Sequence, residues 1–262
     1  MRDVILSLLT AATLASTAYA QQAADAVAPE AGTAVTGAQT DVSPEVSAAQ
    51  EAKSAGRPVE AQTWMIAAAN PLAVSAGADV LRDGGTAADA MVAVQTVLGL
   101  VEPQSSGLGG GAFLVWYDAE SGELTTLDAR ETAPLAATPR LFQTPDGEPM
   151  GFFDAVVGGR SVGTPGTPAL LEEAHRRWGR ANWPSLLEPA IRLAEDGFAV
   201  SPRLAEAVTE DADRLSTDPA TAAYFLPGGE PLTAGETLRN PDYAATLRSL
   251  AATGARSFYA GP

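Results

Sequence analysis

The sequence contains no cysteine and only one histidine, His175. The absence of cysteine excludes disulfide bonds, thiol nucleophiles and thiolate metal sites. A single histidine excludes the multi-histidine sites that hold zinc or iron. We therefore expect neither a metal site nor a cofactor in this chain.

Basic residues are also scarce. The 262-residue chain has 16 lysines and arginines against 32 aspartates and glutamates, which gives a net charge of −16. A nucleic-acid partner requires a basic surface, so we expect none. The acidic excess fits a solvated surface, and a hydrophobic content of 46% is sufficient for a core.

Apart from the N-terminus, the sequence has no hydrophobic run that favours a membrane span. The first residues combine Arg2, an apolar stretch from Val4 to Leu14, and the small-residue site Ala18-Tyr19-Ala20. This combination is typical of a secretory signal. We expect residues 1–20 to be a signal peptide and the protein to be periplasmic or secreted, with no membrane association after cleavage. An uncleaved anchor is the alternative.

Residues 21–62 contain no aromatic side chain and are rich in alanine, glutamine, serine, threonine and proline. This composition predicts a disordered linker. The composition changes at Trp64, and we expect residues 63–262 to form the domain. Its first segment, "WMIAAANPLA", predicts a buried strand that stops at Asn70-Pro71, because a residue before proline disfavours the helical region.

The remaining pattern mixes helices and strands. Thr86 and Asp89 have the spacing of a capping box at the start of a helix. The expected elements are helices over 72–82 and 86–102, strands over 112–118, 123–129 and 155–163, helices over 168–178 and 189–196, and a helix from Ser201-Pro202. Together they predict an α+β fold of layered helices and sheets.

The stretch "PQSSGLGGGAFL" (103–114) carries glycines and two serines. A dinucleotide loop requires a strand before the glycines and a helix after them, and here the order is reversed. A serine nucleophile at Ser105 or Ser106 would require an adjacent base, but His175 lies on a charged helix face. The stretch therefore predicts a tight helix-to-strand turn that leads into the hairpin.

Arg130 lies at the end of the second hairpin strand, between Asp128 and Glu131. A guanidinium group can hold a carboxylate through two parallel hydrogen bonds, which makes Arg130 a candidate for binding a small anion. A structural ion pair with Asp128 or Glu131 is the alternative that the residues themselves leave open.

Several motifs, in order, resemble one enzyme family. They are "ANPLAVSAGADVLRDGGTAADA", "VEPQSSGLGGGAF", "DARETAP", "SVGTPGTPALLEEAHRRWG" and "WPSLLEPAIRLAEDGFAVS". These segments resemble the N-terminal part of the large subunit of gamma-glutamyltransferases, also called glutathione hydrolases. The resemblance extends from about Thr63 to near Pro262. Related cephalosporin acylases share much of this framework.

The resemblance implies an N-terminal-nucleophile hydrolase fold, an αββα sandwich that is incomplete in this chain. It implies a precursor that cuts itself into a large and a small subunit, with a catalytic N-terminal threonine beyond this chain. Its substrates would be glutathione and other γ-glutamyl compounds. Arg130 corresponds to the arginine that holds the α-carboxylate of the glutamyl group. Thr86, Thr132 and Thr164 are interpreted as cap and turn residues.

Under this resemblance the chain is the N-terminal part of a precursor and is expected to be inactive alone. Two alternatives remain at this point. The first is a β-lactam (cephalosporin) acylase built on the same framework. The second is an exported binding protein that keeps the fold without catalysis.

Overall fold

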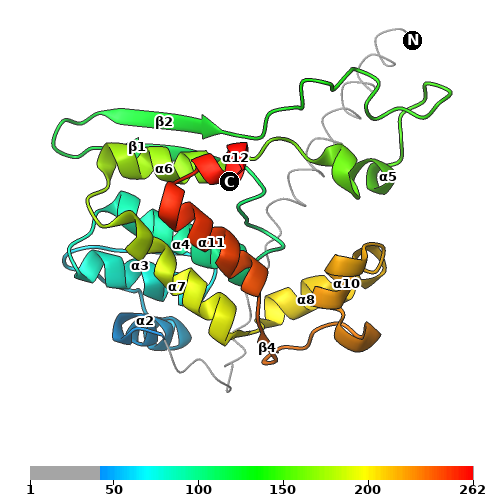
Figure 1. The fold of residues 1–262 in the computed structure, drawn as a ribbon. Coiled ribbons are helices and arrows are strands. Elements are labelled where there is room, and N and C mark those ends of the chain that lie inside the picture. Colours follow the sequence, from blue (N-terminus) through cyan, green and yellow to red (C-terminus); the bar gives the residue numbers. More distant parts are fainter. Residues whose placement is uncertain (1–41, 262) are drawn as a thin grey trace, which may run out of the picture. The chain divides into compact units, whose positions relative to one another are not determined.

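The computed structural model describes residues 42–261 (Figure 1). The expected signal peptide, residues 1–20, and the first half of the expected linker, residues 21–41, lie outside the described residues. Among the helices that are described, none combines the length and the apolar character needed to cross a membrane.

Two helices begin the domain, as the sequence predicts. Helix α3 (Pro71–Arg82) starts at Asn70, whose side chain accepts a hydrogen bond from the Leu72 backbone N–H. Helix α4 (Ala87–Val101) starts with the predicted capping box between Thr86 and Asp89. The small residues of α3 allow close packing, because a Cβ on Gly77 would lie 2.6 Å from Cγ2 of Val94 in α4.

The predicted hairpin follows. Strands β1 (Ala112–Tyr117) and β2 (Leu124–Ala129) are antiparallel, with Ala112 opposite Ala129. One face of the hairpin packs on helix α6 (Thr167–Trp178), where the Trp116 and Trp178 rings stack with their centroids 4.6 Å apart. Figure 1 shows α6 lying along this face. The hairpin is thereby fixed to the helical layer, and the end of β2 has a defined position.

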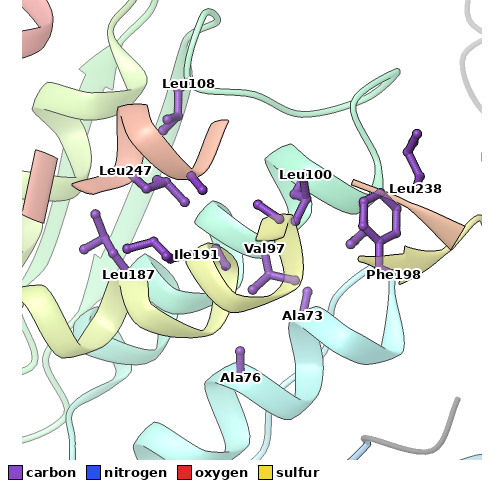
Figure 2. Packing of buried hydrophobic residues seen from close by; sticks show 14 of the residues in the cluster. Ala73, Ala76, Val97, Leu100, Leu108, Leu187, Ile191, Phe198, Leu238 and Leu247 are labelled. Atoms are coloured by element: carbon purple, nitrogen blue, oxygen red, sulfur yellow. The ribbon is translucent and has the colours of Figure 1, made fainter. Parts of the chain in front are cut away.

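The main core lies between α4, helix α7 (Trp183–Asp196) and helix α11 (Pro241–Thr253). Figure 2 shows apolar side chains of this core, among them Val97 and Leu100 from α4 and Leu187 and Ile191 from α7. Strands β3 (Phe198–Ala199) and β4 (Thr237–Leu238) form a second, two-stranded antiparallel sheet beside it.

Shorter elements complete the described part of the chain. They are α2 (Pro44–Ser54), α5 (Phe152–Val156), η1 (Gly159–Ser161), α8 (Pro202–Glu210), α9 (Ala212–Leu215), α10 (Pro219–Phe225), η2 (Pro227–Gly229) and α12 (Arg256–Ala260). The fold class is α+β, as predicted.

Part of the range expected to be a disordered linker is instead helical. Within 21–62, helix α2 begins after Ser43, whose backbone N–H donates to Ser75 Oγ at 2.8 Å. Val46 is buried, and Glu45 forms an ion pair with Arg82 at 2.5 Å. These contacts join α2 to α3 across more than thirty residues of sequence. The composition of residues 21–62 alone could not predict contacts with a segment so far along the chain.

Two expected strands are absent from the described residues. Residues 64–69 have no strand partner, although their side chains alternate between exposed and half-buried. The range 155–163 contains the end of α5 and the turn η1 instead, because Gly158 has a φ of 93° and Ser161 Oγ donates to Val156 O at 2.6 Å. A strand requires a partner to satisfy its backbone groups, and apolar runs alone do not supply one.

Two helix starts also differ from expectation. Helix α7 begins at Trp183, six residues before the expected start, and carries Pro189 inside it. Helix α6 begins at Thr167, one residue before the expected start, and Gly166, not Thr167, occupies its N-cap position. Thr167 Oγ1 instead donates to Gly110 O at 3.0 Å, which connects α6 to the glycine-rich turn.

Candidate functional site

The turn between α4 and β1 lines an open pocket of about 590 Å³ together with the end of β2. The sequence predicts this helix-to-strand turn, and the structure confirms it. The lining residues are Gln95, Pro103, Ser105, Ser106, Gly107, Gly109, Gly110, Gly111, Ala112, Arg130, Glu131 and Thr167. The pocket therefore brings together the two features that the sequence singles out, the glycine-rich turn and Arg130.

Arg130 is held at the rim of the pocket by short contacts. Its Nη1 donates to Gly111 O at 3.0 Å, and its Nη2 lies 3.0 Å from Glu131 Oε2. The guanidinium carbon lies 5.9 Å from the centre of the Phe113 ring. The ion pair that the sequence left open is thus formed with Glu131, whereas Asp128 accepts from the Arg130 backbone N–H at 2.9 Å.

These contacts leave the guanidinium available to a ligand. Its side chain is 52% exposed, and a guanidinium carries five N–H donors, more than the two described contacts use. The structural ion pair and an anion-binding role are therefore compatible, because Glu131 orients the planar fork without covering it.

The turn is fixed to its surroundings mainly through Gly110. Its carbonyl oxygen accepts from the backbone N–H groups of Gly166 and Thr167 at 3.0 and 3.1 Å, in addition to the Thr167 hydroxyl. Three donors on one carbonyl hold the glycine-rich turn against the start of α6. The glycine-rich part of the pocket wall is therefore held in place mainly by backbone contacts.

Gly111 is the point where this turn approaches β2 most closely. A Cβ at this position would lie 2.6 Å from Ala129 O, 2.8 Å from the Cα of Arg130 and 2.8 Å from Glu131 Oε2. Two of these atoms belong to backbone and cannot move aside cheaply.

We therefore expect Gly111→Ala to separate the turn from β2, displace Arg130 and destabilise the protein by about 1–3 kcal/mol. Urea denaturation would measure this loss. Gly109→Ala is the matched control, because a Cβ there meets nothing within 4 Å. Equal stability of the two variants would contradict the close packing described for Gly111.

The two serines and His175 lie in different environments. Ser106 Oγ accepts from Gln95 Nε2 at 2.5 Å, and Ser105 Oγ accepts from Arg203 Nη2 at 3.1 Å. His175 Nε2 lies 2.9 Å from Ala181 O and 3.6 Å from Asp89 Oδ1. The structure thus assigns the histidine ring to the junction after α6 and does not place it with the serines of the pocket.

Sequence reasoning missed Glu102, which lies at the C-cap of α4 and is only 2% exposed. Its carboxylate binds side chains from three separate segments. The one sequence signal that could have identified Glu102 is its position directly after an apolar helix. A carboxylate at such a position can be buried, and buried carboxylates are nearly always paired with other side chains.

Comparison with known proteins gives consistent matches. A family model described as Gamma-glutamyltranspeptidase matches residues 73–262. The chain is 44% identical over 197 residues to a glutathione hydrolase proenzyme of Bacillus subtilis (strain 168), covering 75% of this chain and 33% of that protein. It is 38% identical over 210 residues to the Acylase ACY 1 proenzyme of Pseudomonas sp. (strain SE83), covering 78% of this chain and 38% of that protein.

A solved structure agrees with these sequence matches. The fold resembles the crystal structure of Helicobacter pylori gamma-glutamyltranspeptidase with a TM-score of 0.74 and 35% identity, over 77% of this chain and 58% of that one. The chain spans about a third of the length of the Bacillus subtilis relative that it matches.

Proposed function

The chain belongs to the gamma-glutamyltranspeptidase family, and on that basis we propose that the protein containing it cleaves γ-glutamyl amides such as glutathione. The γ-glutamyl group would pass to water or to an acceptor amine. Within this protein the chain would form the N-terminal part of the large subunit, and the small subunit of the same precursor would be its partner. The name of the relative, a proenzyme, supports a precursor that is processed.

The proposed chemistry divides between this chain and the rest of the protein. The N-terminal threonine of the small subunit would attack the γ-carbonyl carbon, with its own α-amino group as the base. The amine would leave, and water or an acceptor amine would then release the γ-glutamyl group from the threonine oxygen. This chain would bind and orient the glutamyl group. The signal-like residues 1–20 support export to the periplasm or the medium.

The proposal depends on the position of the Arg130 guanidinium at the pocket. Its guanidinium is fixed at Nη1 by Gly111 O and at Nη2 by Glu131, yet it remains half exposed at an open pocket. The α-carboxylate of a γ-glutamyl group is a planar anion that fits a bidentate fork. We assign Arg130 to hold that carboxylate, so that the γ-carbonyl is presented at a fixed distance from it.

A second candidate, an acylase, is favoured by the 38% identity to an acylase proenzyme. A glutaryl group carries a terminal carboxylate that Arg130 could also hold, but it lacks the α-amino group. The two candidates therefore differ in the amino group and share the carboxylate contact. They can be separated only by comparing substrates with and without that amine.

The test uses the complete protein with γ-glutamyl-p-nitroanilide and glutaryl-p-nitroanilide. We expect release of p-nitroaniline from the γ-glutamyl compound, with the glutaryl compound a poor substrate. The reverse preference would establish the acylase, and binding of glutamate without any turnover would indicate a non-catalytic binding protein. Residues 21–262 produced alone should release no p-nitroaniline, and turnover by them would contradict the assignment of the nucleophile to another part of the protein.

A further inference from the structure

Glu102 is a buried carboxylate that binds four side chains. Its Oε1 accepts from Asn70 Nδ2 at 2.9 Å and from Ser201 Oγ at 3.3 Å. Its Oε2 accepts from Gln104 Nε2 at 2.7 Å and lies 3.4 Å from Arg203 Nη1. The Glu102 side chain is only 3% exposed, so these donors replace the water that a carboxylate would otherwise require.

Two of these donors also cap helices. Asn70 caps the start of α3, and Ser201 caps the start of α8 by accepting from the Leu204 backbone N–H at 3.0 Å. Glu102 itself ends α4. One carboxylate therefore joins the ends of three helices at the point where the glycine-rich turn begins. Each partner contributes to the stability of this junction, because loss of any one of them leaves the buried charge less well satisfied.

The same junction extends into the pocket. The backbone N–H groups of Ser105 and Ser106 donate to Glu102 O at 3.0 and 3.1 Å, which folds the start of the turn onto the end of α4. Arg203 reaches from α8 to the same place, with Nη1 at Glu102 and Nη2 donating to Ser105 Oγ at 3.1 Å. Arg203 thus connects the buried carboxylate to an exposed hydroxyl on the pocket wall.

This contact determines what the Ser105 hydroxyl can do. A hydroxyl group has one donor and two acceptor positions. Because Ser105 Oγ accepts from the cationic Arg203, its own proton is free to donate. Ser105 and Arg130 line the same pocket, so this proton is available to a ligand oxygen in the pocket that Arg130 borders.

We propose that Ser105 is a binding residue for the γ-glutamyl donor and that Arg203 and Glu102 are its positioning residues. Ser105 Oγ–H donates to an oxygen of the ligand held by Arg130. Arg203 orients that hydroxyl, and Glu102 fixes Arg203. The inference rests on the proposed function and adds to it a second recognition contact, located on the glycine-rich turn.

The test is a double-mutant cycle in the complete protein, with KM and kcat for γ-glutamyl-p-nitroanilide and the melting temperature measured for each variant. Ser105→Ala and Arg203→Ala should each raise KM about fivefold with kcat close to wild type. The melting temperature should stay close to wild type in Ser105→Ala and fall in Arg203→Ala, because Arg203→Ala also removes a partner of the buried Glu102 carboxylate. The double variant should raise KM no further than one single variant, because both changes remove the same contact. Arg203→Lys, which retains one donor, should recover part of the affinity.

Arg192→Ala is the matched control, since Arg192 lies on α7 and pairs only with the exposed Glu188 at 3.6 Å in the described part of the chain. Unchanged KM in Ser105→Ala or Arg203→Ala would overturn the inference, as would increases that multiply in the double variant. A lower melting temperature with unchanged KM would show a purely structural role and would also overturn it. If the wild-type protein turns over neither γ-glutamyl-p-nitroanilide nor glutaryl-p-nitroanilide, both the proposed function and this inference fail. If the wild-type protein is active and the Ser105 and Arg203 variants have the same KM as wild type, only this inference fails.

Discussion

Replacing Arg130 by alanine in the complete protein should lower kcat/KM for γ-glutamyl anilides by about a hundredfold, because a bidentate charged contact contributes roughly 3 kcal/mol to binding. Arg130→Lys should retain the charge and lose the planar fork. We therefore expect an intermediate loss that falls mainly on KM. Steady-state kinetics with γ-glutamyl-p-nitroanilide would measure both variants.

A stability measurement separates this role from a structural one. The Arg130–Glu131 pair is about half exposed on the arginine side, and exposed pairs contribute at most about 1 kcal/mol. Arg130→Ala should thus change the free energy of unfolding little while it greatly reduces turnover. Wild-type kcat/KM in Arg130→Ala, or a large loss of stability that accounts for the loss of turnover, would contradict the assignment.

The second large effect is expected at Asp89, whose side chain is fully buried. Its Oδ2 accepts from the Thr86 backbone N–H at 2.8 Å and from the backbone N–H groups of Arg180 and Ala181 at 3.1 and 3.2 Å. This carboxylate therefore caps α4 and also fixes the segment that joins α6 to α7. Asp89→Asn places an amide NH₂ group among these donors and should destabilise the protein by about 3 kcal/mol, measured by chemical denaturation.

Asp118→Asn is the matched control for Asp89→Asn. Asp118 Oδ1 accepts from the backbone N–H groups of Glu120 and Ser121 in an exposed turn, and asparagine forms the same turn. Its free energy of unfolding should therefore change by less than about 0.5 kcal/mol. An equally mild Asp89→Asn would contradict the role of this buried carboxylate in holding α4 to the segment between α6 and α7.

The stability contributed by Asp89 depends on pH. Burial tends to raise the pKa of this carboxyl, but hydrogen bonds from Thr86, Arg180 and Ala181 outweigh it, so the pKa lies below its ordinary value. A group with a lowered folded pKa contributes fully above its unfolded pKa, about 3.9, and loses that contribution as the pH falls through the folded value. The stability difference between wild type and Asp89→Asn should therefore shrink as the pH falls below about 4.

Local signals predicted the elements that carry the pocket. The Thr86–Asp89 capping box defined the start of α4, and the glycine-rich turn indicated the change from helix to strand. Arg130 could be placed at the end of β2 because the hairpin is a local structure with a short turn. These features depend on neighbours within a few residues, which is the range that sequence patterns describe.

The elements that sequence reasoning missed depend on distant partners. Glu102 meets Ser201 and Arg203 across about a hundred residues, and nothing at either position predicts the other. Likewise, Asp89 meets Arg180 across ninety-one residues. The prediction of a strand over 155–163 was wrong because it relied on local residues alone. Its apolar residues suggested a sheet, but no partner strand is present in the described residues. The role of Arg130 itself remains a prediction.

The most direct test of the account compares γ-glutamyl-p-nitroanilide with 4-aminobutanoyl-p-nitroanilide, which lacks only the α-carboxylate, in wild-type protein and in Arg130→Ala. If Arg130 holds that carboxylate, wild-type kcat/KM should favour the γ-glutamyl compound by about a hundredfold, and the variant should discriminate little between the two. An equal preference for the γ-glutamyl compound in both proteins would contradict the account, because the carboxylate would then be recognised elsewhere.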